Sequence, residues 1–313
     1  MKISFVIPCY RSERTIEGVV SEIKSVVSQR PEVDYEIIMV SDHSPDNVYA
    51  VIERMCKADP KHLCGLELAR NFGQQAALMA GYARVTGDVV FSLDDDGQAP
   101  VDAVFSIIDT LIGGEYDIVY GAYRVKQHAA FRNLGSCLNR WMAMWLIEYP
   151  KGLRCSSFNA VRRFIIDEIL NYTGPYPYIL GLLIKATKNI GSVEVNHRER
   201  VYGASGYTLR KLIGLWMDGF TAFSVKPLRL ASIAGVLCAA SGFLWGVWVV
   251  IRKVFVDPDV FVGYSSLMAA LLFIGGMLML MLGLVGEYIG RIYICINRSP
   301  QYVVAREFGK EVP

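Results

Sequence analysis

Apolar and polar positions follow two different patterns along the chain and divide it into two parts. In residues 1–207, short and continuous apolar runs are separated by segments whose apolar residues recur at a helical spacing. Continuous apolar runs of this length are typical of strands that are buried on both faces of a helix-covered parallel sheet. We therefore predict an α/β domain with a mostly parallel sheet and helices on both faces. Strands are expected at 3–7, 35–40, 65–68, 88–93 and 116–121, and helices at 15–27 and roughly 73–84.

Two long uncharged runs dominate the C-terminal third of the chain. Residues 230–251 and 260–286 contain no charged side chain. Each run is long enough to cross the roughly 30 Å hydrocarbon layer of a bilayer as a helix. Uncharged runs longer than about 18 residues are rare in soluble domains, so a membrane hairpin explains them better than two buried core helices. We predict a two-helix transmembrane hairpin in residues 230–290, with helices at about 230–251 and 262–288.

Basic residues lie on the two outer flanks of the hairpin, whereas the charges of the connecting residues 252–259 cancel. The positive-inside rule then places both termini in the cytoplasm. The large domain and a tail at 291–313 are predicted to be cytosolic, on a protein of the cytoplasmic (inner) membrane. Neither run has an ionisable side chain in its centre, which argues against a transport channel. The flanking basic residues are Arg210, Lys211, Lys226, Arg229, Arg291, Arg298, Arg306 and Lys310.

A further membrane contact is predicted directly before the hairpin, in residues 208–229. Within it, residues 208–224 place their apolar side chains on one face of a helix and also carry Arg210, Lys211 and Trp216. Such a helix can lie flat among lipid headgroups, or it can pack on the domain as an ordinary amphipathic helix. Residues 138–149 are apolar and aromatic enough for the same two interpretations.

Composition excludes several other classes of protein. The chain has 32 basic and 30 acidic residues and no basic tract, so we expect no nucleic-acid partner. Its 7 cysteines form no CxxC pair and no Cys/His cluster, which indicates reduced thiols and argues against a zinc site. The N-terminal stretch "MKISFVIPCY" has too short an apolar run for a signal peptide and is better explained as a strand.

The stretch "FSLDDDGQAP" places three acidic residues directly after an apolar strand. Strand alternation puts Asp94 and Asp96 on one side and Asp95 on the other. Two carboxylates and the amide oxygen of Gln98 are hard oxygen ligands that suit Mg²⁺ or Mn²⁺ shared with substrate phosphates, and Gly97 permits a tight turn. The alternatives are a solvated acidic turn and a DxDxT-type phosphatase, although the latter would require threonine at position 98.

Three more stretches accompany the acidic triplet at predicted strand ends. They are "VIPCYRSERTI" (6–16), "VSDHSPDN" (40–47) and "ARNFGQQAALMAGYARVTGD" (69–88). Together with D-x-D-x-Q, this set resembles family 2 glycosyltransferases, which are inverting enzymes with a GT-A nucleotide-sugar-binding domain. With two C-terminal spans, the chain looks like the polyprenyl-phosphate branch, which includes dolichol-phosphate mannose and glucose synthases. The resemblance covers nearly the whole chain and is most specific over 69–100.

The resemblance implies roles for the residues that match the family patterns. Pro8, Tyr10 and Glu13 would line the base and ribose pocket, and Asp42 would contact the base. Asp94 and Asp96 are the implied catalytic carboxylates, together with Arg200. The implied nucleotide-sugar contacts are Pro8, Tyr10, Glu13, Asp42, Asp94 and Asp95, and the implied ligands of Mg²⁺ or Mn²⁺ are Asp94, Asp96 and Gln98.

The family's acceptor loop has a counterpart in "GAYRVKQHAAFRNLGS" (121–136). Two guanidinium groups and a hydroxyl suit a terminal phosphate monoester, although a basic loop that contacts headgroups would look similar. A second counterpart is "HRERVYGASGYTLRKL" (197–212), which would supply a segment that closes over the donor. The implied acceptor-phosphate contacts are Arg124, Arg132, Ser136 and Arg200, and the flexible loop contains Gly203, Ser205 and Gly206.

This chain departs from the family patterns at several positions. Near the base pocket, Arg11 stands where the family usually has Asn, Ser41 where it has Asp, and His43 where Gly is common. Ser156 and Ser157 occupy a segment where some relatives have an Asp that has been considered a base. A phosphate monoester with a second pKa near 6 is already mostly dianionic at neutral pH, so the acceptor needs positioning rather than deprotonation. Ala204 replaces a frequent Lys.

The sequence thus predicts an inverting, metal-dependent hexosyltransferase that uses a nucleotide sugar and polyprenyl (undecaprenyl) phosphate. UDP-glucose is the first candidate donor, and GDP-mannose, UDP-N-acetylhexosamine and UDP-aminoarabinose derivatives are alternatives. Two other classes are a non-catalytic membrane scaffold and a processive polysaccharide synthase, the latter normally with more spans and a Q-x-x-R-W motif. Glycine-rich faces of the spans would also allow a homo-oligomer.

Overall fold

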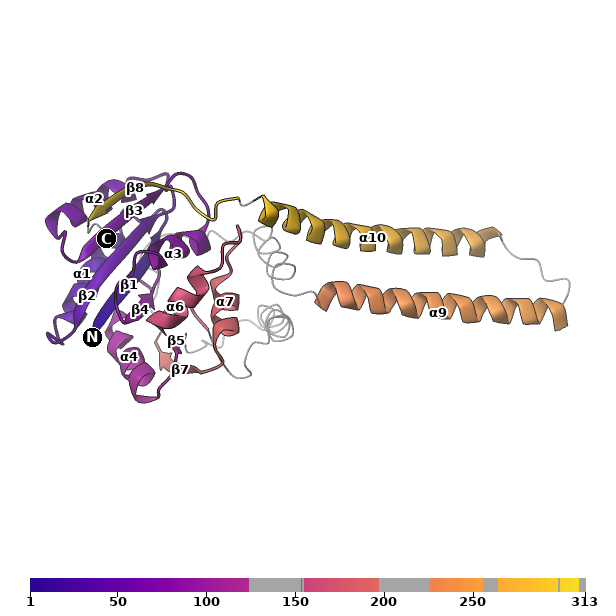
Figure 1. The fold of residues 1–313 in the computed structure, drawn as a ribbon, viewed down its shortest axis with the longest axis horizontal. Coiled ribbons are helices and arrows are strands. Elements are labelled where there is room, and N and C mark those ends of the chain that lie inside the picture. The colour runs from indigo at the N-terminus through magenta and orange to yellow at the C-terminus, as the bar shows by residue number, and fades with distance from the viewer. Residues whose placement is uncertain (124–152, 154, 197–225, 256–263, 298, 310–313) are drawn as a thin grey trace. The chain divides into compact units, whose positions relative to one another are not determined.

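The computed structural model describes residues 1–123, 153, 155–196, 226–255, 264–297 and 299–309 (Figure 1). The chain forms two compact units. One combines Met1–Tyr207 with Arg298–Pro313, and the other is Thr208–Asn297. The predicted helix at 208–224 and the apolar segment 138–149 lie outside the described residues.

The first unit contains an eight-stranded sheet in the order β7-β5-β6-β4-β1-β2-β3-β8 (Figure 1). Parallel pairing joins β1 to β2 and β4, β2 to β3, and β5 to β7, while β6 and β8 run antiparallel to their neighbours. The strands are β1 (Lys2–Cys9), β2 (Asp34–Ser41), β3 (Leu63–Leu68), β4 (Val89–Ser92), β5 (Ile118–Tyr123), β6 (Asn159–Arg162), β7 (Ile190–Val195) and β8 (Val304–Gly309).

All five predicted strands are present, and the prediction of a mostly parallel sheet is confirmed for the strands other than β6 and β8. Three strands were not predicted. β6 and β7 are short or half-exposed, so neither has the continuous apolar run of a central strand. β8 lies in the segment that we predict as a tail, and it covers the edge of the sheet beside β3.

Helices cover both faces of the sheet, as predicted. In β1, the side chains of Ile3, Phe5 and Ile7 belong to one buried cluster, whereas Val6 belongs to the other. This is the two-residue alternation of a strand that is buried on both sides. One face is covered by α1 (Ile16–Val27), α2 (Val48–Ala58) and α4 (Val104–Gly113), and the other by α3 (Gln74–Tyr82), α6 (Arg163–Leu170) and α7 (Ile179–Ala186).

A buried ionic cluster surrounds Glu36 within β2. Its carboxylate accepts hydrogen bonds from Lys2 Nζ at 2.7 Å, Ser4 Oγ at 2.6 Å and both the backbone N–H and the hydroxyl of Thr86 at 2.6 and 2.8 Å. Burial alone would raise the pKa of Glu36, but these hydrogen bonds outweigh burial and lower it from its ordinary value of 4.5. A group whose pKa is lowered on folding stabilises the fold above its unfolded pKa.

Glu36→Gln should therefore lower the free energy of unfolding at pH 7 by about 1–2 kcal/mol, because the amide cannot accept all of these hydrogen bonds. The stabilising contribution of the native carboxylate is lost as the pH falls through its folded pKa, below 4.5. Unfolding midpoints of detergent-solubilised wild type and variant should differ at pH 7 and converge as the pH is lowered below 4.5. A gap that is constant over this range would contradict the assignment.

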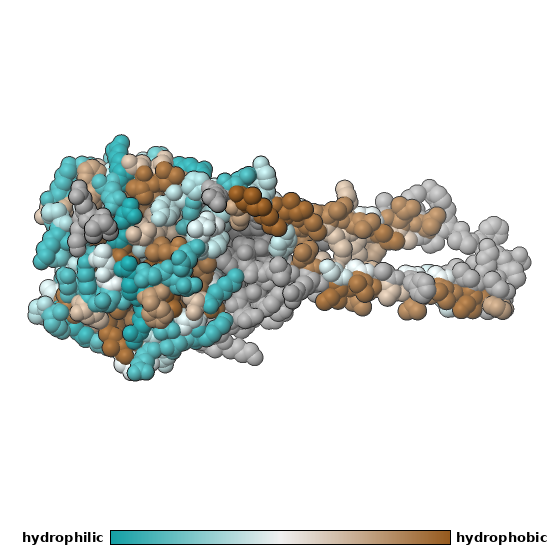
Figure 2. Space-filling model, in the orientation of Figure 1, coloured by the Kyte–Doolittle hydropathy of each residue, from teal (hydrophilic) through white to brown (hydrophobic). Residues whose placement is uncertain are grey.

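The second unit consists of α9 (Lys226–Phe255) and α10 (Tyr264–Ile296). Both helices are long and apolar enough to cross a membrane, with the most apolar windows at Ala231–Trp248 and Phe273–Gly290. Figure 2 shows hydrophobic residues along the surface of both helices. Among them, Trp245 is 67% exposed and Phe273 65%. Such surfaces are stable in lipid rather than in water. The predicted helices at 230–251 and 262–288 are thus observed, except that residues 262 and 263 lie outside the described residues.

Candidate active site

The predicted donor-site residues meet at one edge of the sheet. β1, β2 and β4 are parallel neighbours, so the loops that follow them lie at the same edge. Tyr10 follows β1, Asp42 follows β2 and Asp94 follows β4. A direct link joins two of these loops, because the backbone N–H of Tyr10 donates to Asp95 Oδ2 at 2.9 Å.

Asp94 and Asp96 act on one common neighbour, Tyr123 at the end of β5. Burial, together with the negative charges of Asp94 and Asp96, raises the pKa of the Tyr123 phenol to about 12. Both carboxylates therefore lie within electrostatic range of this hydroxyl, and their common orientation toward a cation remains a prediction. Gln98 is held next to them, since its backbone N–H donates to Asp96 Oδ1 at 3.0 Å.

Two residues that hold Asp94 were not predicted from the sequence. Gln74, the first residue of α3, donates its side-chain N–H to Asp94 Oδ1 at 2.7 Å. Ser157 donates its hydroxyl to the other oxygen, Oδ2. From the sequence alone, Ser157 is only a residue in a segment where some relatives have an Asp. The sequence signal for Gln74 was its place in the "RNFGQ" stretch, directly after the glycine.

Asp95 points away from this pair, toward the loop after β1. Burial, together with the negative charge of Asp94, raises the pKa of Asp95 to about 6. The carboxyl group of Asp95 therefore joins the β4 loop to the β1 loop. Its predicted contact with a nucleotide sugar remains a prediction.

The loops after β1 and β2 are joined by several hydrogen bonds. Arg11 N–H donates to Ser44 Oγ at 2.7 Å, and Glu13 N–H donates to Asp46 Oδ2 at 3.0 Å. In return, Asn47 N–H donates to Glu13 Oε2 at 3.2 Å. Glu13 thus fixes the two loops relative to each other. Its predicted contact with the nucleotide remains a prediction.

Arg11 and His43 have left-handed backbones, with φ of 59° and 49°. These are two of the positions where the chain departs from the family pattern. Asn and Gly, the usual family residues, tolerate this region best, whereas other residues cost roughly 1–2 kcal/mol there. The family preference therefore has a backbone cause, and this chain keeps the loop shape with less suitable residues.

Tyr10 and Pro8 contribute differently to the wall of the site. The Tyr10 side chain is 45% exposed, and the Arg11 guanidinium lies 5.6 Å from the centre of its ring. An exposed ring of this kind can stack on a planar base. Pro8 is buried within β1 and pairs with Val40 of β2, so it packs inside the sheet next to the loop that begins at Tyr10.

Asp42 is buried, and both of its carboxylate oxygens accept backbone hydrogen bonds. Phe72 N–H donates to Oδ1 at 2.7 Å and Gly73 N–H donates to Oδ2 at 2.8 Å. Burial raises the pKa of Asp42 from its ordinary value of 3.8 in spite of these hydrogen bonds. Asp42 therefore anchors the loop that leads into α3 and Gln74. Its predicted contact with the base stays a prediction.

The carboxylates present fit a divalent cation that is shared with a ligand. In the described part of the chain, no group of three or more His, Cys, Asp or Glu side chains could hold a metal ion alone. Asp94, Asp96 and Gln98 nevertheless offer hard oxygen atoms at the sheet edge. Mg²⁺ and Mn²⁺ sites often combine one or two carboxylates with substrate phosphates, and this donor set suits that arrangement.

The remaining predicted site residues belong to segments outside the described residues. The structure therefore neither tests nor places the acceptor-phosphate contacts or the flexible loop. These residues are Arg124, Arg132, Ser136, Arg200, Gly203, Ser205 and Gly206.

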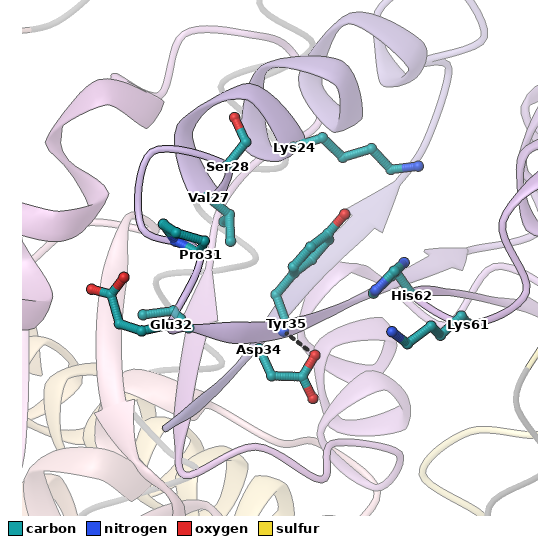
Figure 3. A pocket seen from close by; sticks show the side chains of 10 residues that line it. Lys24, Val27, Ser28, Pro31, Glu32, Asp34, Tyr35, Lys61 and His62 are labelled. Atoms are coloured by element: carbon teal, nitrogen blue, oxygen red, sulfur yellow. Dashed lines mark hydrogen bonds between the residues drawn. The ribbon is translucent and has the colours of Figure 1, made fainter.

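A separate pocket lies at the opposite end of β2, where Asp34 and Tyr35 begin the strand (Figure 3). The Tyr35 ring stacks on His62, with ring centres 4.6 Å apart. His62 Nδ1 and Lys24 Nζ both contact Asp59, at 2.9 and 2.6 Å. Asp59 thus already pairs with two basic side chains of this pocket, which lies at the end of β2 opposite the acidic triplet.

Comparison with known proteins agrees with this geometry. The profile described as "Glycosyl transferase family 2" matches residues 4–170, which include the ends of β1, β2, β4 and β5. The chain belongs to glycosyl transferase family 2. The profile "GtrB C-terminal hairpin" matches residues 226–292, which contain α9 and most of α10. This combination confirms the predicted membership in the polyprenyl-phosphate branch of the family.

Relatives match over almost the full length of this glycosyltransferase. An undecaprenyl-phosphate 4-deoxy-4-formamido-L-arabinose transferase of Proteus mirabilis (strain HI4320) is 34% identical over 100% of this chain and 95% of its own length. An uncharacterized glycosyltransferase, YkcC, of Bacillus subtilis (strain 168) is 32% identical over 99% of this chain and 95% of its own.

Solved structures support the GT-A fold. Glucosyl-3-phosphoglycerate synthase from Mycobacterium tuberculosis, in complex with uridine diphosphate, has a TM-score of 0.52 at 20% identity. The similarity covers 71% of this chain and 78% of that one. The same enzyme in complex with Mn²⁺, UDP-glucose and phosphoglyceric acid has a TM-score of 0.51 at 20% identity, over 70% and 77% of the two chains.

Proposed function

We propose that this glycosyltransferase transfers a sugar from a nucleotide sugar to a polyprenyl phosphate, with inversion at the anomeric carbon. The observation that carries the proposal is the Asp94 carboxylate, which Gln74 and Ser157 hold at the carboxyl edge of the sheet, with Asp96 two residues further along the same loop. This edge belongs to a chain with two apolar, membrane-length helices. A water-soluble donor and a lipid acceptor are the substrates that need both features.

The chain's own residues would hold the donor. Tyr10 offers an exposed ring to the base, and the joined loops after β1 and β2 form the wall beside it. Gln74 and Ser157 fix Asp94, while Asp96 and Gln98 lie beside it. A divalent cation held by Asp94, Asp96 and Gln98 would neutralise the departing diphosphate as a Lewis acid. A structurally similar enzyme is described in complex with Mn²⁺ and UDP-glucose, which supports this assignment.

The acceptor is expected to need orientation rather than a base. Ser156 donates its hydroxyl to the carbonyl of Gly121 at 2.7 Å, and Ser157 donates to Asp94, so both hydroxyls support the site. The phosphate oxygen of the acceptor is already ionised at neutral pH. Arg124, Arg132, Ser136 and Arg200 remain our candidates for holding it behind the anomeric carbon.

The fold supports an arrangement in which the hairpin enters and leaves the membrane on the same side. β1 precedes α9 in the chain and β8 follows α10, yet both strands belong to one sheet. Because one sheet cannot be divided by a bilayer, an even number of spans must separate these strands. With the basic flanks of the hairpin, this favours two spans with the active site and both termini in the cytoplasm.

The decisive experiment incubates the purified full-length protein with undecaprenyl phosphate, Mg²⁺ or Mn²⁺, and a panel of labelled nucleotide sugars. The panel contains UDP-glucose, GDP-mannose, UDP-N-acetylglucosamine and UDP-4-deoxy-4-formamido-L-arabinose. The last is included because the Proteus mirabilis relative is named for that sugar. We expect label in an organic-extractable, mild-acid-labile lipid with one of these donors.

Each outcome of this assay discriminates between classes. Transfer of one sugar per lipid supports the proposal and identifies the donor, whereas long products would support a processive synthase. If folded, metal-supplied protein transfers none of the four sugars and binds no nucleoside diphosphate, the membrane-scaffold alternative is favoured.

A further inference from the structure

We propose that residues 301–304, which follow the second apolar helix, position the donor-site loop 69–74, and that Gln301 is the residue that fixes this segment. The inference rests on the proposed function, because it assigns a role in donor binding. It concerns a part of the chain that the sequence indicated only as a tail.

The first step is the attachment of this segment to the sheet. Val304 begins β8 and pairs with Leu68, the last residue of β3. Tyr302 and Val304 pack against the apolar cluster that also contacts Phe72. One residue beyond the end of β3, Ala69 N–H donates to the carbonyl oxygen of Val303 at 2.8 Å. The start of loop 69–74 is therefore hydrogen-bonded directly to Val303.

The second step is the position of Gln301. Its side-chain amide donates to the carbonyl oxygens of Tyr172 and Gly174, at 3.3 and 2.9 Å. These carbonyls belong to the loop that leads into α7, whose first residue, Ile179, donates its N–H to Gln75 Oε1 at 3.0 Å. Gln301 thus holds a second loop that meets the start of α3, next to Gln74.

The third step connects loop 69–74 to the acidic pair. Within six residues the loop begins at the Ala69–Val303 hydrogen bond, passes the two N–H groups bound by Asp42, and ends at Gln74, which donates to Asp94. If Ala69 moves, the residues that follow it in the loop move as well. Through the hydrogen bond of Gln74, the displacement reaches Asp94, a proposed ligand of the cation. Small errors in the position of such a ligand have large effects on binding and rate.

β8 also offers a control contact at its other end. Glu307 accepts two hydrogen bonds from the Arg84 guanidinium, at 2.9 and 3.1 Å. Arg84 follows α3, and the 9 residues of α3 place it about 13 Å from Gln74 along the helix axis. Weakening this contact loosens the same strand without touching loop 69–74.

The test compares Gln301→Glu, which keeps the shape but removes the donor N–H groups, with Gln301→Lys, which retains donors. We expect Gln301→Glu to raise the KM for the nucleotide sugar about 5- to 10-fold, with the KM for undecaprenyl phosphate unchanged. The KM of Gln301→Lys for the nucleotide sugar should lie close to the wild-type value. Glu307→Gln should lower the unfolding midpoint and leave the donor KM unchanged.

Binding of UDP and GDP in the presence of Mn²⁺, measured by calorimetry on the full-length variants, separates this inference from the proposed function. If the wild type binds and transfers but Gln301→Glu leaves the donor KM unchanged, the positioning role is wrong. It is equally wrong if Glu307→Gln raises the donor KM as much as Gln301→Glu does. If the wild type neither binds a nucleotide nor transfers a sugar, the proposed function itself is wrong.

Discussion

Asp96→Ala should reduce sugar transfer by about a thousandfold or more, because it removes a ligand of the cation that would stabilise the leaving diphosphate. The side chain lies at the carboxyl edge of the sheet, where it accepts a hydrogen bond from the N–H of Gln98. We expect membrane insertion to be unchanged, because the residue belongs to neither α9 nor α10. The measurement is steady-state transfer to undecaprenyl phosphate with the donor identified for the wild type.

Asp34→Ala is a suitable matched control for Asp96→Ala. Asp34 is an exposed carboxylate at the amino end of β2, where it accepts a hydrogen bond from the N–H of Tyr35. Its removal should leave transfer within about twofold of wild type, since isolated surface substitutions have small effects. Normal turnover in Asp96→Ala, with membrane insertion and unfolding midpoint unchanged, would refute the assignment of the cation site.

The central part of the fold was predictable because its physical cause is local in the sequence. The strands at 35–40 and 88–93 contain the apolar runs 37–40 and 89–91, and burial on both faces of a sheet requires such runs. The parallel order of neighbouring strands then places their polar ends at one edge. Asp94, Asp95 and Asp96 follow the end of β4 at Ser92, so strand alternation does not itself set their directions; the structure shows that Asp95 accepts a hydrogen bond from the loop after β1.

β8 was not predictable in the same way. Its residues Val304–Gly309 include Arg306 and Glu307, and four of its six residues are exposed, so the segment has no clear apolar pattern. Its strand conformation is set by tertiary pairing with β3, a partner more than 200 residues earlier in the chain. Local propensity contains no information on such a partner.

The supporting contacts of the site were missed for a related reason. Gln74 and Ser157 both hold Asp94, but they are separated by most of the first domain and neither residue type signals a site alone. The family resemblance identified the residues expected to touch a ligand. The structure was needed to identify the residues that orient them.

Asp42→Asn should reduce transfer about 30-fold or more while changing the unfolding midpoint little. Asp42 binds the N–H groups of Phe72 and Gly73, and an amide offers only one oxygen, so one of these groups loses its acceptor. The loop would then hold Gln74, and through it Asp94, less firmly. A loss of about 2 kcal/mol in transition-state stabilisation corresponds to a rate reduction of roughly 30-fold.

The small expected effect on stability follows from the raised pKa of Asp42. Burial raises this pKa above 3.8, so the ionised form at pH 7 is less favourable in the folded protein than in the unfolded chain. Its stabilising contribution exists below pH 3.8 and is lost as the pH rises through the folded pKa. Asn removes that unfavourable charge, which offsets about 1 kcal/mol from the lost hydrogen bond.

Unfolding midpoints and donor KM, measured on the same preparations, separate the two effects. A midpoint that falls in proportion to activity would show that Asp42 serves the fold alone, whereas full activity would show that the loop keeps its shape without this carboxylate.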